Sequence, residues 1–382
     1  MAQEWHEGGT ARGGHDAGFS LRARRVPAAA FEGGRPPGYP TPWGNRACLS
    51  YDLGHCGLES IFQNPSPGTQ QPMRRDCHRD MSPVFLLLVH ADPQQAKRLL
   101  RRLVSVGRCI VHVDAKADLS AFRIEDPRVN YVKDRVDVRW GAISQVDATL
   151  RLMRTALAEC EVSQVSHFML LSGNCYPLRP LEEFRAFSQL HADTNFIKLI
   201  PLASTRKLHQ RVRHFWFYQD LPVDGRKYTL VRLSRGLLQF VGKLGRRSFP
   251  LFPQWHFGSQ WWALTPEAVR YLVSYPHETS VKRFLRFSKA PDEIYFHTLL
   301  ANSPLQHTVE PVSGSGVWDA ANLHLIDPSL SRWFHTSDYE EIVASGKWFV
   351  RKVGSGISSD RCDRLDRNGN PDLLAQAGKE TA

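Results

Sequence analysis

Residues 84–114, with the sequence VFLLLVHADPQQAKRLLRRLVSVGRCIVHVD, decide the fold of this chain. The apolar runs at 84–89 and 109–113 have the length and continuous hydrophobicity of strands buried on both faces. Between them, Asp92 precedes a proline and an apolar pattern of helical period that ends at Gly107, which are the residues expected at a helix start and stop. A strand–helix–strand unit of about 30 residues predicts two parallel strands joined by a right-handed crossover.

The chain continues in the same alternating pattern to about residue 300. In order, we expect a helix at 142–159, strands at 167–171, 195–200 and 260–264, and helices that open at Pro266 and Pro291. Residues 202–255 are basic and aromatic without clear periodicity, and they are predicted to be irregular.

These elements predict an α/β fold with an open, mostly parallel sheet flanked by helices. Ligands of such sheets bind outside the carboxyl ends of the strands. His90 follows the first predicted strand, Asp114 follows the second, and residues 172–175 follow the strand at 167–171. Their common position makes this edge of the sheet a candidate site.

Composition divides the chain into three segments. Residues 1–80 are rich in Gly and Pro, contain arginine but no lysine, and lack apolar periodicity. They are predicted to be a disordered tail or a misassigned extension of a protein that starts at Met81, and the mass of the native protein distinguishes the two. Residues 81–355 form the predicted folded domain, and residues 356–382 a predicted disordered polar tail.

Charge and cysteine content narrow the class of protein. A net charge of +11 suits an anionic partner, such as a sugar nucleotide, an anionic membrane surface or nucleic acid. The seven cysteines show no metal-binding spacing, which favours reduced thiols in a cytoplasmic protein. No apolar run has the roughly 20 residues that span a bilayer, and no signal-peptide core is present. Peripheral contact with the inner membrane face remains compatible with the charge.

Several catalytic motifs are missing from the sequence. It has no GxxxxGK(S/T) phosphate loop, GxGxxG, HExxH or GxSxG. It also has no Asp-x-Asp triplet of the kind that holds a metal-bound diphosphate, and the nearest segment, 338–340, lies in a helical pattern. We therefore expect no metal and no cofactor.

Residues 289–299, KAPDEIYFHTL, place two carboxylates after a proline at a predicted helix start. Asp292 and Glu293 could be an ordinary acidic first turn, which the helix dipole favours. They could equally present a general base at the rim of a cleft.

Other candidates also have two interpretations. His90 could simply end a buried strand, and Asp114 could be a turn residue. Trp140 could anchor the core or form a wall for a sugar or base. The cations and aromatics of 202–216 could bind sugar or form a solvated loop, and those at 351–352 could be surface charges.

Taken together, seven segments in order resemble the core-2/I-branching β-1,6-N-acetylglucosaminyltransferase family, which includes the peptide O-xylosyltransferases. The resemblance covers about residues 84–353 and rests on Leu88–His90, His112–Lys116, Val138–Ala142, Leu170–Leu178, Phe257–Trp262, Ala290–Glu293 and Trp348–Lys352. The absence of an anchor and of the disulfide pattern of animal members makes the chain similar to bacterial-type relatives.

The resemblance implies a GT-A-like fold and an inverting transfer from a UDP-sugar to a hydroxyl acceptor without a metal. GlcNAc is the first expected sugar and xylose the second. Glu293 is the implied general base. The implied donor-binding residues are Leu88, Val89, His90, Asp114, Ala115, Lys116, Trp140, Arg332 and Lys352, with Lys352 on the diphosphate.

Arg211, Arg213 and Trp261 are predicted acceptor contacts. One departure from the family pattern is Cys175, which stands where relatives often have a carboxylate. Two alternative functions remain at this point: a metal-dependent GT-A transferase of another family, and a basic nucleic-acid-binding protein. Against the second, the cations are dispersed and no nucleic-acid-binding motif is present.

Overall fold

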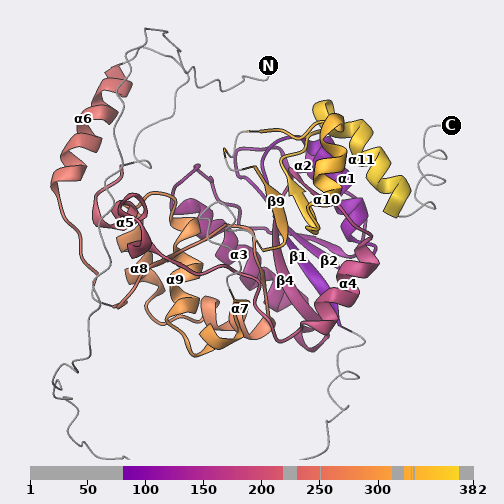
Figure 1. Ribbon diagram of the computed structural model, residues 1–382, viewed down its shortest axis with the longest axis horizontal. Coiled ribbons are helices and arrows are strands. Elements are labelled where there is room, and N and C mark those ends of the chain that lie inside the picture. Colours follow the sequence, from indigo (N-terminus) through magenta and orange to yellow (C-terminus); the bar gives the residue numbers. More distant parts are fainter. Residues whose placement is uncertain are drawn as a thin grey trace, which may run out of the picture. The chain divides into compact units, whose positions relative to one another are not determined.

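A computed structural model of the chain confirms the α/β fold (Figure 1). It describes residues 81–217, 230–249, 251–311, 322–327, 329 and 332–369. The predictions for residues 1–80 and 370–382 lie outside the described residues.

The strand–helix–strand unit at the start of the domain is confirmed. β1 (Ser82–Val89) and β2 (Arg108–Val113) pair in parallel, and α1 (Pro93–Leu103) connects them. The side chain of Asp92 caps α1 by accepting a hydrogen bond from the backbone N–H of Gln95 at 3.1 Å. Gly107 is required where the chain turns into β2, because a Cβ there would lie 2.0 Å from the carbonyl oxygen of Pro83.

The central sheet has the strand order β3-β2-β1-β4-β8. β3 (Val129–Tyr131), β2, β1 and β4 (Val165–Ser172) run parallel, and only β8 (Ala263–Leu264) is antiparallel. The sheet is therefore mostly parallel, and the carboxyl ends of β1, β2 and β4 meet at one edge.

Helices cover both faces of the sheet (Figure 1). Val84 and Leu86 of β1 pack into one core cluster with the buried face of α3 (Ser144–Glu159). Phe85 and Leu87 pack into a second cluster with α1 and α4 (Leu181–Leu190). Burial on both faces explains why β1 is apolar without alternation. Truncating one of these leucines to alanine should cost about 2–5 kcal/mol.

A second sheet positions the C-terminal cations. β10 (Phe349–Arg351) pairs antiparallel with β5 (Cys175–Pro177) and parallel with β9 (His324–Ile326).

The remaining elements are short. β6 (Ile200–Pro201) and β7 (His256–Phe257) form a two-stranded sheet. Further helices include α2 (Leu119–Phe122), α7 (Pro266–Val273), α8 (Glu278–Leu285), α9 (Tyr295–Ala301) and α10 (Tyr339–Ala344). Short 3₁₀ turns lie at Val162–Gln164, Leu202–Ser204, Pro291–Glu293, Pro304–Thr308 and Thr336–Asp338.

Three sequence predictions about the middle of the chain are wrong. The segment 195–200 touches the central sheet only through a bridge from Phe196 to Ala263 and is otherwise not a strand until β6. The stretch 202–255 contains two helices, α5 (Arg206–Arg213) and α6 (Leu230–Leu244). The helix expected to open at Pro291 is a 3₁₀ turn, because Ile294 leaves the helical region at φ −123° and the α-helix starts one residue later.

The predicted disordered tail is wrong for residues 356–369, which belong to helix α11 (Ser355–Gly369). Its polar side chains find distant partners: Asp363 and Asp366 pair with Arg98 of α1 at 2.5 and 2.6 Å. Cys362 and Leu365 are buried beneath them. None of the helices in the described ranges is both long and apolar enough to cross a membrane.

Candidate active site

The carboxyl ends of β1 and β2 bring His90 and Asp114 together. Val89 and Val113 lie opposite each other in the parallel register, and the N–H of Asp114 donates to the carbonyl of Val89 at 2.8 Å. His90 is exposed at this edge, whereas Asp114 is only 5% exposed. The prediction that the two residues share one edge of the sheet is confirmed.

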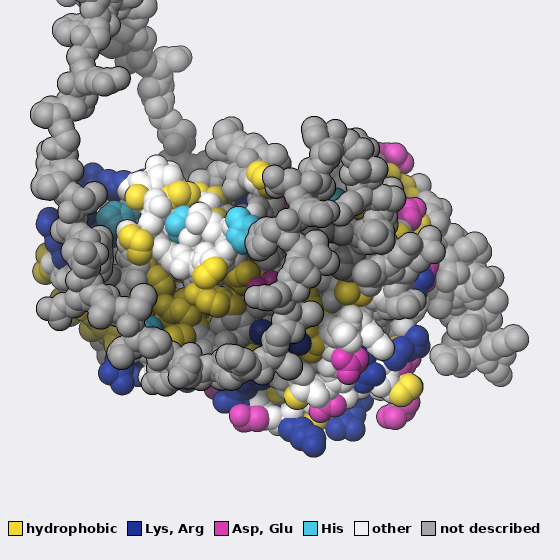
Figure 2. All heavy atoms as spheres, turned by 90° about the horizontal axis from the view of Figure 1, so that it is seen from below, with side chains coloured by type: hydrophobic (Ala, Val, Ile, Leu, Met, Phe, Trp, Pro, Cys, Tyr) yellow, Lys and Arg dark blue, Asp and Glu magenta, His cyan; other side chains and the backbone are white. Residues whose placement is uncertain are grey.

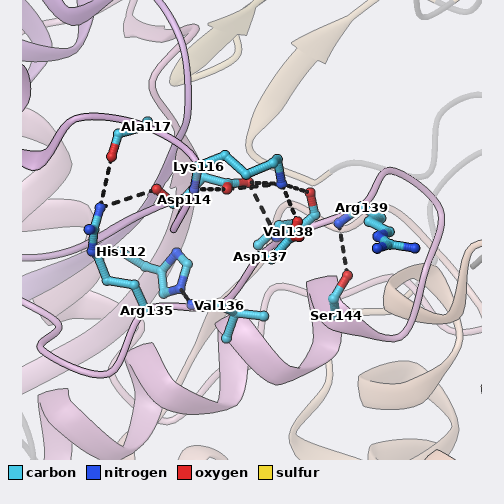
Figure 3. A network of polar contacts seen from close by, with 10 residues as sticks. All are labelled: His112, Asp114, Lys116, Ala117, Arg135, Val136, Asp137, Val138, Arg139 and Ser144. Atoms are coloured by element: carbon cyan, nitrogen blue, oxygen red, sulfur yellow. Dashed lines mark hydrogen bonds and ion pairs between the residues drawn. The ribbon is translucent and has the colours of Figure 1, made fainter. Parts of the chain in front are cut away.

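Asp114 organises the loops beside it (Figure 3). One carboxylate oxygen accepts from the N–H of Lys116 at 2.9 Å, and the other accepts from its Nζ at 3.1 Å. The second oxygen also accepts from the N–H of Val138 at 3.3 Å. Asp114 is thus both a turn residue and the point at which two loops of the candidate site meet.

Lys116 joins the same two loops through hydrogen bonds of its ammonium group. Its Nζ donates to the carbonyl of Val138 at 2.7 Å and also bonds Asp137. Although partial burial opposes it, these carboxylate hydrogen bonds raise the pKa of Lys116. Its cation is therefore retained at neutral pH and held next to the site.

Trp140 stands at the tip of this connection and is 80% exposed, so it does not anchor the core. The following Gly141 adopts φ +71°, and its N–H donates to the side chain of Gln145 at the start of α3. The turn therefore projects a large aromatic face outward, as a stacking surface for a sugar or base requires.

His112, one of the residues of the resemblance, has a structural role. Its Nε2 accepts a hydrogen bond from the N–H of Val136 at 2.9 Å, which ties β2 to the loop that carries Val138. Burial lowers the pKa of His112 to about 4. It stays neutral at physiological pH and supports the loop without supplying charge.

β10 delivers two adjacent cations to the same edge. Arg351 points inward, donates from Nε to the Ser172 hydroxyl at 3.0 Å, and lies over the ring of Trp261 at 4.7 Å. Lys352 is half-buried, and burial together with Arg351 lowers its pKa. Within the described ranges no carboxylate pairs with either cation.

The strand ends form one electrostatic cluster. Although His90 is exposed, desolvation by the protein around it lowers its pKa; Asp114 opposes this, and the cations Arg351, Lys116 and Lys352 lower the pKa further. Residues from β1, β2 and β10 therefore lie within electrostatic range of one another. Two neighbouring cations without an acidic partner are costly to bury, and a bound anion such as a diphosphate would stabilise them.

Glu293 occupies the 3₁₀ turn Pro291–Glu293, and its side chain is held from one side. Oε2 accepts a hydrogen bond from Nη1 of Arg211 at 2.6 Å, and Arg211 also lies over the ring of Phe257 at 4.5 Å. For Oε1 no partner occurs among the residues that the structure describes. This arrangement orients the carboxylate and leaves one oxygen to accept a proton.

The segment Phe257–Trp262 connects Glu293 with the cation cluster. The N–H of Gly258 donates to the carbonyl of Glu293 at 3.0 Å, while Trp261 supports Arg351. Gly258 has no room for a side chain, because a Cβ would lie 2.4 Å from the ring of His297. The predicted base and Arg351, the neighbour of the predicted diphosphate-binding lysine, thus contact the same short segment.

Other predicted contacts lie differently. Arg332 is paired with Asp338 and Glu341, each at 3.0 Å, so a diphosphate would have to compete for it. Trp261 is only 7% exposed beneath Arg351, which leaves little surface for an acceptor. Arg213 faces a hollow with other basic residues rather than Glu293. Leu88 and Val89 belong to β1, and Ala115 is exposed beside Asp114.

The burial of Asp292 and the position of Cys175 beside Arg351 could not be identified from the sequence. Asp292 is buried, and burial together with Glu293 raises its pKa to about 8, so it is mostly protonated at neutral pH. Cys175 faces Arg351 across the β5–β10 pair, and its Sγ lies 3.4 Å from the Ser172 hydroxyl. Burial raises the pKa of the Cys175 thiol, so a neutral group stands beside the cation.

The described cysteines, Cys109, Cys160, Cys175 and Cys362, are all free and buried. Among the described residues, no cluster of three or more His, Cys, Asp or Glu side chains is arranged to hold a metal ion.

Comparison with known proteins identifies the family. The model of the core-2/I-branching enzyme family matches residues 84–316, and the chain belongs to this family. Human xylosyltransferase 2 is 29% identical over 268 residues, which cover 65% of this chain and 28% of that protein. Rat xylosyltransferase 1 is 26% identical over 229 residues, 58% of this chain and 26% of that protein. The matched region thus spans less than a third of these relatives. The family predicted from the sequence is confirmed.

Proposed function

We propose that the chain is an inverting glycosyltransferase that moves a sugar from a UDP-sugar to a hydroxyl acceptor. The observation that carries this proposal is the segment Phe257–Trp262, which contacts both Glu293 and Arg351, the cation that directly precedes Lys352. A base and an anion-binding cluster on either side of one short segment are the two groups that such a transfer needs.

In the proposed reaction, Oε1 of Glu293 takes the proton of the acceptor hydroxyl while that oxygen attacks the anomeric carbon. The bond from this carbon to the UDP oxygen breaks, and its electron pair leaves with the diphosphate. Lys352, with Arg351 behind it, stabilises the resulting negative charge, which fixed cations can do without a metal. Trp140 and the Asp114 loop contact the nucleotide or the sugar.

The donor sugar is proposed to be xylose or GlcNAc. The names of the matched relatives favour xylose, whereas the family resemblance alone favours GlcNAc. Both sugars can be tested in one experiment, in which UDP release is measured for a panel of UDP-sugars with and without EDTA. Release from none of them, or release that strictly requires a divalent metal, contradicts the proposal.

The base is tested with Glu293→Gln, which keeps the shape and the Arg211 contact but cannot take a proton. UDP release should fall by about 10²–10⁴-fold, while UDP affinity stays nearly unchanged. The matched control is Asp292→Asn, which imitates the protonated state of the neighbouring carboxyl and should retain most activity at pH 7. Near-normal turnover of Glu293→Gln would remove the base assignment.

A further inference from the structure

Helix α6 turns an apolar face away from the protein. Leu237, Phe240, Val241 and Leu244 are exposed by 64, 62, 52 and 71%. At 100° per residue they lie on the side of the helix opposite Gly242, which is buried. An amphipathic helix normally buries such a stripe, whereas here none of the described residues covers it.

The outward orientation of α6 is fixed by specific contacts. The N–H of Phe215 donates to the carbonyl of Gly242 at 3.1 Å, and a Cβ at Gly242 would lie 2.4 Å from the Phe215 carbonyl oxygen. Past the helix, His214 Nδ1 bonds the carbonyl of Gly245 at 3.2 Å, and the N–H of Arg247 donates to the carbonyl of Arg213 at 2.8 Å. The helix packs through its glycine side and leaves the apolar side outward.

Basic residues surround the end of α6. A hollow of about 210 Å³ is lined by Arg206, His209, Gln210, Arg213, His214 and Arg246. Lys243 is exposed on the last turn of the helix, and the sequence contains no acidic residue between Asp224 and Glu267. Seen from below, Lys and Arg side chains also lie along the left edge, the side on which α5 and α6 are drawn in Figure 1 (Figure 2).

We propose that α6 and the basic hollow at its end bind an anionic lipid bilayer. The apolar stripe would enter the boundary between headgroups and acyl chains, and the hollow would take headgroup phosphates. Charge complementarity selects this partner over a second copy of the chain, because two copies joined through α6 would bring their arginine clusters together. An apolar face bordered by cations is the pattern of interfacial helices.

The position of α5 links this surface to the candidate active site. Arg213 and Arg211 lie on the same helix, and they face the hollow and Glu293 respectively. A bilayer bound at the hollow would thus lie close to the acceptor side. This last step rests on the proposed function, whereas lipid binding itself does not.

The test is flotation of the full chain with vesicles of phosphatidylcholine alone and of equal parts phosphatidylcholine and phosphatidylglycerol. We expect binding to the anionic vesicles, weakened by salt. The double variant Leu237→Glu/Phe240→Glu should bind at least tenfold more weakly, and Arg246→Glu should lose part of the binding to anionic vesicles. The matched control is Leu190→Glu on α4, where the wild-type side chain is 67% exposed; its binding should be unchanged.

Circular dichroism and melting temperature confirm that each variant is folded, and light scattering gives the mass of each. Three results would overturn the proposal. The first is a wild type that does not bind anionic vesicles. The second is a Leu190→Glu control that loses as much binding as the double variant. The third is a wild-type dimer that the double variant dissociates while vesicle binding stays the same. Loss of vesicle binding with normal UDP release, or the reverse, separates this proposal from the proposed function.

Discussion

Replacing Asp92 by alanine should destabilise the protein more than the loss of an ordinary helix cap. One carboxylate oxygen of Asp92 accepts from the N–H of Gln95 in α1 at 3.1 Å, and the other accepts from the N–H of Ser355 in α11 at 2.8 Å. Asp92 also adopts the left-handed conformation, with φ 53°. A single side chain therefore caps two helices that are far apart in the sequence.

The size of the effect follows from these contacts. Loss of a helix cap costs typically about 1 kcal/mol, and Asp92→Ala loses two. Alanine tolerates the left-handed region less well than aspartate, whose short polar side chain compensates by local hydrogen bonding, and this adds about 1 kcal/mol. We expect a total near 3 kcal/mol, which corresponds to a fall of about 6–12 °C in melting temperature for a domain somewhat smaller than this one.

Urea unfolding and UDP titration measure the two consequences. His90 lies two residues before Asp92, and Lys352 lies three residues before Ser355, so loss of the cap should also weaken UDP binding. The control is Asp118→Ala, which removes a single cap from α2 at an exposed position, where the Ser120 N–H donates at 3.0 Å. A loss of stability in Asp92→Ala no larger than in Asp118→Ala would refute the double-cap argument.

Three further predictions concern charge. Lys352→Ala should raise the dissociation constant for UDP about 10- to 150-fold, which is the effect of losing one charge-assisted hydrogen bond. Arg351→Ala should mainly lower the melting temperature, because Arg351 packs on Trp261. Equal small effects of both variants on UDP binding would indicate that both residues are ordinary surface cations. UDP should raise the free energy of unfolding by about 2.7 kcal/mol at a hundredfold excess over its dissociation constant, and so raise the melting temperature without added metal; stabilisation abolished by EDTA would contradict this. The pKa of Asp292 is raised to about 8. The free energy of unfolding of the wild type, relative to that of Asp292→Asn, should therefore be greatest below about pH 4 and should fall as the pH rises through 8. The same dependence of unfolding free energy on pH in both proteins would disprove this.

The meeting of His90 and Asp114 at one edge of the sheet could be predicted because its determinants are local. Continuous apolar runs give β1 and β2, and a cap, a proline and a glycine delimit the helix between them. Parallel pairing then places the residue after each strand at the same edge, so His90 and Asp114 meet without any knowledge of the loops. The Asp114 hydrogen bond to the N–H of Lys116 is likewise a contact between near neighbours in the sequence.

The remaining features depend on contacts between distant residues. Arg211 and Glu293 are 82 positions apart, and no spacing rule pairs them. Helix α11 has too few apolar residues to be predicted from periodicity, because ion pairs with Arg98, more than 260 residues earlier, replace part of the apolar packing. The burial of Asp292 cannot be distinguished in the sequence from the partial exposure of Glu293 beside it.

The cations of the two proposed binding sites differ in burial. Lys352 and Arg351 lie partly inside the protein, where burial lowers the pKa of both, so one well-placed anion would offset the cost of burying their charge. Lys243 and Arg246 at the end of α6 are exposed, and such charges act over a broad surface and are screened beyond about 8 Å at physiological salt. The two sites should therefore differ in salt dependence: UDP affinity should fall less steeply with ionic strength than binding to anionic vesicles. A net charge of +11 could not by itself choose between a sugar nucleotide and a membrane, because the two kinds of cation differ only in their surroundings.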